Sequence, residues 1–346
     1  MNNYKVIFVG DSRKMKGGVS TVMKNLEKST LWGKRECYWL ETQINSANKW
    51  LKVLYLLRGF IKGIFMIPRY QIVHFQTAPG NSMKTLFPIF IFSMLCRKKI
   101  IVQLHTGNQI KKHVNDWLFK FWTTHTNCLI FLGKMWKEEI EPYLKKSIKT
   151  EFVYNPVDVQ KKQDLCKKYF LFAAYFNVNK GIDVILEAFS IVVKNYNDWK
   201  LIMCGSGDTI KIIDFVNKHQ LNDKIILPGW IEGKEKEFLF KNAYAYCMTS
   251  YEEGLPMSVL EAISYGVPLI STPVGCLPEV FNDNKTCLFF NFGDVNDLAK
   301  KMELLIKDYE LRTELSNNSY KLCQEYFTIE AVANKLDNIY NSLTED

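Results

Sequence analysis

One stretch of the chain decides its fold: Ser250-Tyr-Glu-Glu-Gly-Leu-Pro-Met-Ser-Val-Leu-Glu-Ala-Ile-Ser-Tyr-Gly-Val-Pro-Leu-Ile-Ser-Thr-Pro-Val-Gly-Cys-Leu-Pro-Glu-Val280. Pro256 suits the first position of a helix, because an N–H would have no partner there. No helix breaker follows until Gly266, which suits a C-terminal cap, and Pro268 prevents the helix from continuing. The sequence therefore predicts a helix over about 256–265.

Two strand-like runs flank this helix, at 243–248 and at 267–271. Both are short and apolar, as in strands that are buried on both faces of a parallel sheet. A helix between two such strands is typical of open α/β sheets, which bind ligands at the carboxyl ends of their strands. The turn that precedes the helix is therefore expected at a ligand-binding edge.

That turn has the chemistry of a phosphate site. The first N–H groups of a helix have no internal partner, and with the positive end of the helix dipole they favour anions. Glu253 in the turn and Glu261 in the helix add two acceptor-only carboxylates. A ligand with phosphates and hydroxyls, such as a nucleotide sugar, fits this combination. The other residues expected to bind it are Gly254, Leu255, Pro256 and Met257.

Three segments carry a resemblance to a known family: Glu253-Gly-Leu-Pro-Met-Ser-Val-Leu-Glu261, Gly266-Val-Pro268 and Gly275-Cys-Leu-Pro-Glu279. They resemble the E-x7-E signature of retaining glycosyltransferases with the GT-B fold, especially glycosyltransferase family 4. The resemblance implies two Rossmann-like domains with parallel sheets that face a cleft, and a last helix, about 329–343, that crosses back to the first domain. The alternative, an amphipathic helix with two solvated glutamates, leaves the glycine and proline pattern unexplained.

Length and composition agree with two folded domains. The chain has 346 residues, of which 47% are hydrophobic, enough for two separate cores. The segment Glu151–Asp158 resembles the element that closes the first domain in the family. We therefore expect an acceptor-side domain over 1–160, a linker at about 160–168, and a nucleotide-sugar-binding domain over 161–346.

The nine cysteines form no Cys-x-x-Cys pair and no Cys/His cluster at zinc spacing. They indicate reduced thiols in a cytoplasmic protein. Tyr4 to Gly10 is a short apolar run that ends in a turn, so no signal peptide is expected. The longest apolar segment, 86–96, contains Pro88 and is too short to span a bilayer.

Positive charge is concentrated in the first part of the chain. Residues 1–160 contain 25 Lys and Arg against 10 Asp and Glu, a balance of +15, and residues 161–346 contain 20 against 26, a balance of −6, which sum to +9. A basic domain favours an anionic partner such as lipid head groups or a phosphorylated acceptor. Nucleic acid is not expected, because no zinc finger, RRM-type motif or basic leucine zipper is present.

A helix is predicted over 48–67, where large apolar residues are interleaved with Lys49, Lys52, Arg58 and Lys62. This mixture suits an interfacial helix, because apolar burial and attraction to anionic lipid act together. It predicts peripheral attachment to the inner face of the cell membrane. The alternative is a helix that packs on the core and leaves a basic face in solvent.

The first domain offers three candidate site residues. Gly17 and Gly18 lie between the first expected strand and helix, where glycines either approach phosphate or close a turn. His105, in His-Thr-Gly107, resembles the first-domain histidine of the family, which implies a catalytic contact with the donor sugar or the acceptor. The remaining histidines of this domain are interpreted as structural: His74, His113 and His125.

The second domain offers further candidates. Lys180 precedes Gly181 at a strand-to-helix crossing and matches the donor-phosphate lysine of the family. The family usually has an arginine five residues earlier, where this chain has Tyr175, which brings no charge. Gly205 belongs to a Gly-x-Gly turn that lacks the third glycine of a dinucleotide loop but matches the turn near the nucleotide. Trp230 either stacks on the base or belongs to the core.

The resemblance implies that a sugar moves from a nucleotide diphosphate sugar to a hydroxyl acceptor with retention, through same-face attack assisted by the departing phosphate. Lys180, Glu253 and His105 would take part, and Glu261 would bind the ribose. No D-x-D motif occurs, so neither a metal nor another cofactor is expected. The expected acceptor is a lipid-linked or oligosaccharide chain of a cell-surface polysaccharide or glycolipid.

Two other functions remain open. A nucleotide-sugar epimerase of the same fold would turn over the donor without an acceptor. A non-catalytic scaffold protein that binds nucleotide sugar is suggested by Tyr175 and by Cys276, which replaces the second glycine of the Gly-Gly pair usual in the family.

Overall fold

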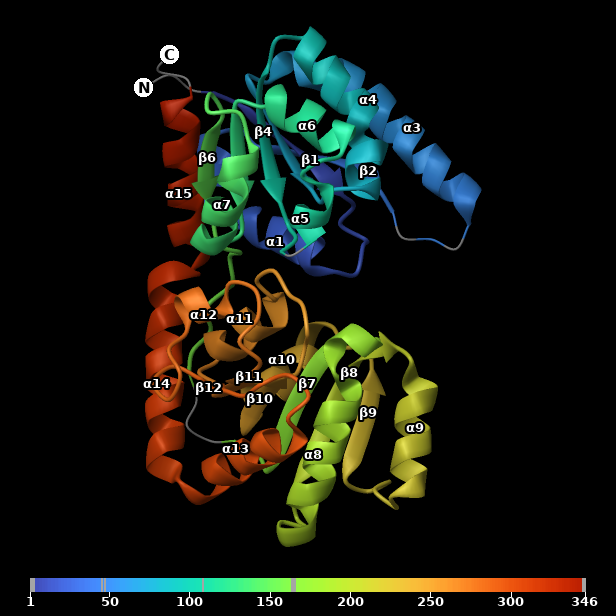
Figure 1. The fold of residues 1–346 in the computed structure, drawn as a ribbon. Helices are drawn as coiled ribbons and strands as arrows, with labels where there is room; N and C mark the ends of the chain where they lie inside the picture. The colour runs from blue at the N-terminus through green and yellow to red at the C-terminus, as the bar shows by residue number, and fades with distance from the viewer. Residues whose placement is uncertain (1–3, 45, 47, 108, 163–165, 344–346) are drawn as a thin grey trace. The chain divides into compact units, whose positions relative to one another are not determined.

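The computed structural model describes residues 4–44, 46, 48–107, 109–162 and 166–343 (Figure 1). The chain divides into two compact units: unit 1 comprises Met1–Val157 and Phe327–Asp346, and unit 2 comprises Asp158–Tyr326. The last residues, which we expected to cross back to the first domain, are thus grouped with unit 1. Residues 163–165 of the expected linker lie outside the described residues.

Unit 1 is built on a sheet of six described strands, all parallel, in the order β2-β1-β3-β4-β5-β6. The central strands are almost fully buried, as a parallel sheet covered by helices on both faces requires. The strands are β1 (Val6–Asp11), β2 (Tyr38–Gln43), β3 (Ile72–Thr77), β4 (Lys99–Leu104), β5 (Cys128–Phe131) and β6 (Lys149–Phe152).

Aromatic side chains fill the core of unit 1. Phe90 stacks on Trp122 with ring centroids 4.0 Å apart, and the helices that carry them, α4 and α6, lie side by side (Figure 1). The helices are α1 (Gly18–Leu26), α2 (Thr30–Lys34), α3 (Lys49–Met66), η1 (Ile67–Arg69), α4 (Asn81–Leu95), α5 (Gln109–His113), α6 (Trp117–Thr124), α7 (Lys134–Ile140), η2 (Glu141–Tyr143) and α15 (Ile329–Ser342).

The C-terminal helix α15 is anchored to α2 and the residues after it. Arg35 Nε donates to Asp337 Oδ1 at 2.5 Å, and Lys34 Nζ donates to Asp337 Oδ2 at 2.7 Å. The side chains of Arg35 and Asp337 are only 4% and 10% exposed. Burial alone would raise the pKa of Asp337, but the hydrogen bonds and positive charges of Arg35 and Lys34 lower it overall.

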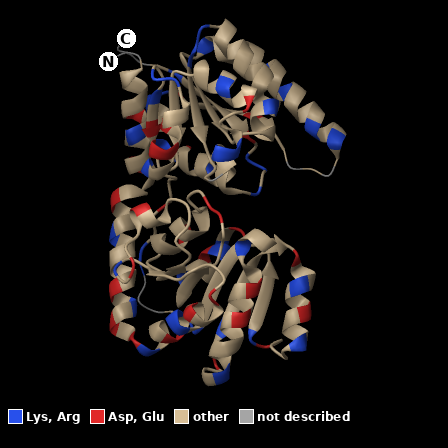
Figure 2. Ribbon diagram, in the orientation of Figure 1, with Lys and Arg blue, Asp and Glu red and all other residues tan. Residues whose placement is uncertain are grey.

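The helix α3 packs on β2 through glycine. A Cβ on Gly59 would lie 2.9 Å from the carbonyl oxygen of Glu41, and Gly59 and Gly63 are the buried residues of the helix. The expectation that α3 could pack its apolar side chains on the core is therefore wrong. Its Lys and Arg residues are spread along the helix (Figure 2), and most of its large apolar residues are exposed. They are Trp50, Leu51, Val53, Leu54, Leu57, Ile61, Ile64 and Phe65.

Unit 2 is built on a second sheet of six described strands, all parallel, in the order β12-β11-β10-β7-β8-β9. Phe170 and Phe172 of β7 and Leu201 and Met203 of β8 are buried in its core. The strands are β7 (Tyr169–Phe176), β8 (Lys200–Gly207), β9 (Ile225–Gly229), β10 (Ala245–Met248), β11 (Leu269–Ser271) and β12 (Leu288–Phe289).

Two groups of helices cover this sheet, since α8 packs against α9 and α13 whereas α11 packs against α10 and α14. The helix α8 presents an apolar face that is almost wholly buried. The helices are η3 (Val178–Lys180), α8 (Ile182–Asn195), α9 (Thr209–Lys218), α10 (Gly233–Lys241), α11 (Met257–Ser264), α12 (Leu277–Val280), α13 (Val295–Lys307) and α14 (Tyr309–Tyr326).

The helix predicted over 256–265 is α11, with one correction. Pro256 is its N-cap in an extended conformation, not its first helical residue. Gly266 ends the helix as predicted: its φ is 74°, and its N–H donates to the carbonyl of Ile263 at 2.9 Å. Across the described residues, no helix combines the length and the apolar character needed to cross a membrane.

Candidate functional site

The carboxyl ends of β7 and β10 mark the topological switch point of the second sheet. The strand β7 comes first in the chain, β8 and β9 follow on one side of it, and β10, β11 and β12 lie on the other. At such a point the loops after two neighbouring strands diverge, which leaves room for a ligand. Here the two loops carry Lys180, shortly after β7, and Glu253, after β10.

Backbone contacts hold these two loops together. Thr249 Oγ1 donates to the carbonyl of Lys180 at 2.7 Å, and the N–H of Tyr251 donates to the carbonyl of Asn179 at 2.9 Å. Gly181 has a φ of 62°, and a Cβ there would lie 2.2 Å from the carbonyl oxygen of Thr249. Only glycine fits this close approach, which fixes where the Lys180 side chain begins.

The two loops bring Lys180 and Glu253 into contact. Lys180 Nζ lies 2.5 Å from Glu253 Oε1, and Ser250 Oγ donates to the same oxygen at 2.7 Å. The side chains of Lys180 and Glu253 are 21% and 15% exposed, so solvent screens the pair less than it screens a surface ion pair. An ammonium group has three N–H donors, and this contact uses one of them.

The loop that contains Glu253 is supported from behind by the residues after β11. The N–H of Cys276 donates to the carbonyl of Gly254 at 2.9 Å. Gly275 has a φ of 60°, and a Cβ there would lie 2.3 Å from the carbonyl oxygen of Gly254. The thiol of Cys276 is buried, so the replacement of the second glycine of the family's pair puts no side chain on the surface of the loop.

The candidates at the start of α11 differ in what they can offer to a ligand. Leu255 and Met257 have buried side chains, so a ligand would meet their backbone. Pro256 has no N–H and cannot donate to phosphate. Pro256 can therefore make only van der Waals contact with a phosphate. The backbone N–H groups that could donate to a phosphate belong to Gly254 and Met257.

Glu261 has a partner that sequence analysis missed. Its Oε1 lies 2.7 Å from Lys236 Nζ of α10, which is 25 positions away in the chain. Burial raises the pKa of Glu261, and the nearby charge of Lys236 opposes this rise. The sequence of α10 does not distinguish Lys236 from the other lysines of this helix, because the contact with Glu261 depends on how α10 packs on α11.

The other candidates of unit 2 lie at the carboxyl ends of their strands. Tyr175 at the end of β7 is 59% exposed and faces Ser206 of β8 in the sheet register. Packing alone requires glycine at position 205, because a Cβ on Gly205 would lie 1.8 Å from the carbonyl oxygen of Ala174. Trp230, directly after β9, is partly exposed, and its Nε1 donates to Glu232 at 2.9 Å.

In unit 1, the switch point lies between β1 and β3, and the loop after β1 ends in the two candidate glycines. Gly17 is the N-cap of α1, and Gly18 is the first residue of this helix. A Cβ on Gly17 would meet no atom within 4 Å, so the backbone there faces open space. In the first turn, the buried Ser20 Oγ has no hydrogen-bond partner among the described residues.

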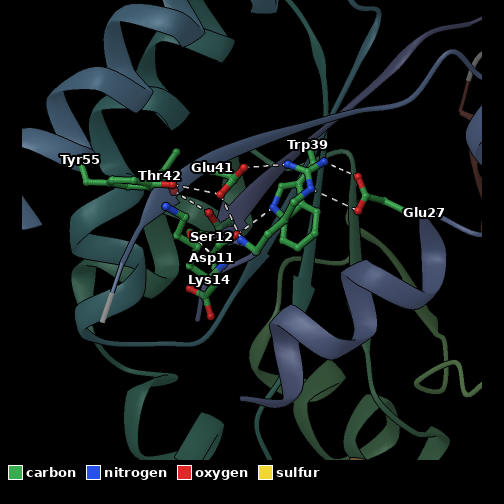
Figure 3. Close-up of polar contacts among 10 residues, drawn as sticks. Asp11, Ser12, Lys14, Glu27, Trp39, Glu41, Thr42 and Tyr55 are labelled. Atoms are coloured by element: carbon green, nitrogen blue, oxygen red, sulfur yellow. Dashed lines mark hydrogen bonds and ion pairs between the residues drawn. The ribbon is translucent and has the colours of Figure 1, made fainter. Parts of the chain in front are cut away.

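This loop is clamped by Arg13, which sequence analysis did not single out. Its guanidinium group pairs with Glu27, the C-cap of α1, and, at 2.7 Å, with Glu41 of β2. It also lies 4.4 Å from the centroid of the Trp39 ring. Tyr55 of α3 donates to Glu41 at 3.0 Å. Glu27, Glu41 and Tyr55 thus approach the loop from three elements (Figure 3).

His105 lies directly after β4 and is held by a buried glutamine. Its Nε2 is 2.5 Å from Gln76 Oε1 of β3. Burial lowers the pKa of His105 to about 4, so the ring is neutral at pH 7. His74 is fully buried and contacts the hydroxyl of Tyr340 at 2.8 Å, which confirms that it is a structural residue.

The structure thus joins Lys180 to Glu253 within unit 2, while Glu261 forms a second pair with Lys236. The candidates of unit 1 follow two strands at the carboxyl edge of the first sheet: Gly17 and Gly18 lie at the start of α1, after β1, and His105 lies directly after β4. The described residues contain no group of three or more His, Cys, Asp or Glu side chains arranged to hold a metal ion.

Comparison with known protein families finds a match in unit 2. Residues 157–322 match the family model described as glycosyl transferases group 1. The chain is similar to the glycosyl transferases of this group. The match spans nearly all of unit 2, and so includes the two loops that carry Lys180 and Glu253.

Two relatives and one solved structure extend the comparison. An uncharacterized glycosyltransferase of Haemophilus influenzae is 24% identical over 64% of this chain and 62% of its own length. A Campylobacter jejuni transferase that adds N-acetyl-D-galactosamine to a GalNAc-GalNAc-diNAcBac-PP-undecaprenol is 25% identical over 65% of this chain and 66% of its own. The chain therefore spans less than two thirds of either relative.

The crystal structure of Anabaena Alr3699/HepE in complex with UDP-glucose has a TM-score of 0.77 and 14% identity, over 98% of this chain and 100% of that one. At this identity the likeness concerns the fold. Together with the two parallel sheets, it shows a GT-B fold with two Rossmann-like domains, as the resemblance in the sequence implied.

Proposed function

We propose that the chain is a retaining glycosyltransferase of family 4, which moves a sugar from a nucleotide diphosphate sugar to a hydroxyl acceptor. The observation that carries the proposal is the contact between Lys180 and Glu253 at the switch point of unit 2. The similarity of residues 157–322 to group 1 glycosyl transferases supports it. So does the UDP-glucose bound by the Anabaena protein of the same fold.

The leaving diphosphate gains negative charge as the glycosidic bond breaks. Lys180 and the backbone N–H groups of Gly254 and Met257 would stabilise this charge, because they are already in place before it develops. Glu253 would accept hydrogen bonds from the sugar hydroxyls while it holds the Lys180 ammonium group. Glu261, held by Lys236, would accept hydrogen bonds from the ribose.

Retention follows in this proposal from attack on the same face that the diphosphate leaves. The departing phosphate oxygen, rather than a protein carboxylate, would take the proton of the acceptor hydroxyl. The charge of the diphosphate would be balanced by Lys180 and the dipole of α11, so that the reaction needs no metal. His105 would contact the donor sugar or the acceptor.

Nucleotide binding tests the assignment of the site. A nucleotide of one base, among UDP, GDP and ADP and their sugar conjugates, is expected to raise the melting temperature of the wild type. The reason is that a ligand bound only by the native state adds about 2.7 kcal/mol of stability at 100 times its Kd. Glu261→Ala is expected to lose this shift in differential scanning fluorimetry.

Glu303→Ala serves as the matched control, because Glu303 of α13 also pairs with a lysine, Lys307. This variant should keep the nucleotide shift. If millimolar nucleotides shift neither the wild type nor Glu303→Ala, the proposed donor site is wrong, and a scaffold protein with a decayed site becomes the better explanation.

We also propose that the protein attaches to the inner face of the cell membrane, where its acceptor is lipid-linked. The exposed side of α3 supports this, since Trp50, Leu54 and Phe65 are 78%, 61% and 65% exposed on a helix that also carries four basic residues (Figure 2). Apolar side chains that enter the head-group region and cations that meet anionic lipid act together on such a helix. The undecaprenol-linked substrate of the Campylobacter relative agrees with a lipid-linked acceptor.

Vesicle binding tests this attachment. The wild type is expected to sediment at low salt with vesicles that contain phosphatidylserine, and less with vesicles of phosphatidylcholine alone. Leu54→Glu combined with Phe65→Glu should abolish sedimentation, because charge replaces the apolar contact. Leu95→Glu is the control, as Leu95 is 75% exposed at the end of α4. Equal binding by all three proteins would refute the role of α3.

A further inference from the structure

A buried chain of hydrogen bonds connects α15 to His105 within unit 1. The hydroxyl of Tyr340 lies 2.8 Å from His74 Nδ1. Gln76 Nε2 lies 3.1 Å from His74 Nε2 and 3.0 Å from Gln103 Oε1. Gln76 Oε1 lies 2.5 Å from His105 Nε2. Gln76 and Gln103 are opposite each other in the register of β3 and β4, which places the chain at the carboxyl edge of the sheet.

The chemistry of the amide group decides where each proton lies. An amide nitrogen only donates, so Gln76 Nε2 uses its two hydrogens for Gln103 Oε1 and for His74 Nε2. An amide oxygen only accepts, so His105 Nε2 must carry the hydrogen that points at Gln76 Oε1. A neutral imidazole has one N–H, which leaves a lone pair on Nδ1 of His105. By the same logic, His74 carries its hydrogen on Nδ1.

The surroundings hold Gln76 in this position. Its side chain is buried, and both ends of its amide have partners: Nε2 donates to Gln103 and His74, and Oε1 accepts from His105. His105 itself is partly exposed. Its Nδ1 makes no hydrogen bond to any part of the chain that the structure describes, so this lone pair is available to a ligand.

We propose that Gln76 is a positioning residue, which holds His105 as the Nε2–H tautomer so that Nδ1 accepts a hydrogen bond from a hydroxyl of the substrate. This role rests on the proposed function, since the hydroxyl belongs to the donor sugar or to the acceptor. A charged His105 or the opposite tautomer would present an N–H instead, so the hydroxyl would accept a hydrogen bond from the ring and could no longer donate one to it. Gln76 therefore supports the reaction through His105 without a substrate contact of its own.

The tautomers can be measured in the wild type without substrate. The chain has five histidines, so a two-bond ¹H–¹⁵N spectrum of the imidazole rings at pH 7 has few signals. The spectrum of His105→Gln identifies the signals of His105. We expect His105 to be neutral with its hydrogen on Nε2, and His74 to be neutral with its hydrogen on Nδ1. A hydrogen on Nδ1 of His105, or a charged ring, would overturn the proposal.

Three variants then connect the tautomer to the reaction. Gln76→Met removes the oxygen that accepts from His105, and kcat is expected to fall about tenfold with little change in KM, as for loss of a contact made mainly in the transition state. Gln76→Glu keeps an accepting oxygen but adds a negative charge beside Nε2, which favours a charged His105, so it should also lower kcat and give the imidazole signals of a charged ring. Gln103→Met also removes a buried amide but leaves the contact with His105, so it should keep both kcat and the tautomer.

An equal fall of kcat in Gln76→Met and Gln103→Met, with the His105 signals unchanged in both, would reduce Gln76 to a structural residue and contradict the proposal. Failure of the proposed function has a different signature. If the wild type turns over no donor, kcat cannot be compared among the variants. The imidazole spectra of the wild type and Gln76→Met still decide whether Gln76 sets the tautomer of His105.

Discussion

Lys180→Ala is expected to lower kcat for sugar transfer by about a hundredfold or more, which is the effect of removing one preorganised donor from a developing anion. In this structure the ammonium group is partly buried and already held by Glu253, so it needs little reorganisation when the diphosphate leaves. Glu253→Ala should lower kcat at least about tenfold, because it removes both an acceptor for the sugar and the partner of Lys180. The measurement is transfer of radiolabelled sugar from the nucleotide identified by thermal shift.

Lys168→Ala is the matched control for Lys180→Ala. Lys168 also forms an ion pair, with Asp198, but both side chains are mostly exposed and lie before β7 and β8, at the opposite edge of the sheet. This variant should keep the wild-type rate. The anomeric configuration of the product, read by NMR, should be that of the donor. Wild-type rates in Lys180→Ala and Glu253→Ala would show that the reaction takes place elsewhere.

The regular elements could be predicted because their signals are local. The strand predicted over 243–248 contains β10 and ends at the same residue, and the helix predicted over 256–265 differs from α11 by one residue at each end. An uninterrupted apolar run, a proline and a glycine act on the residues next to them, so their effect does not depend on the rest of the fold. The contact of Glu253 with Lys180 is predictable for a related reason, since the loops after neighbouring parallel strands meet at one edge of the sheet.

The contacts that hold the candidate site could not be predicted, because they join residues that only the tertiary structure brings together. Lys236 reaches Glu261 through the packing of α10 on α11, and Arg13 reaches Glu41 through the pairing of β1 with β2. The exposure of α3 is a further case. Its sequence suits a core helix as well as an interfacial one, and the close approach at Gly59 decides between them.

Asp337→Ala is expected to destabilise unit 1 by about 3–5 kcal/mol, because it leaves the buried guanidinium group of Arg35 without its carboxylate. Arg35 and Asp337 are 4% and 10% exposed, so water cannot replace the lost partner without local opening. Urea unfolding followed by tryptophan fluorescence measures the effect well, since Trp32, Trp39, Trp50, Trp117, Trp122 and Trp136 all lie in unit 1.

Two further comparisons separate charge from packing. The double variant Arg35→Met and Asp337→Leu removes both charges and should be less destabilised than Asp337→Ala, because no ion is left buried and unpaired. In the wild type, the pKa of Asp337 is lower in the folded than in the unfolded chain, so its stabilising effect is complete above the ordinary aspartate pKa of about 3.9 and is lost as the pH falls through the folded pKa. Asp337→Asn should lack this acid-dependent loss. An unchanged unfolding midpoint in Asp337→Ala would mean that α15 is held by its apolar face alone.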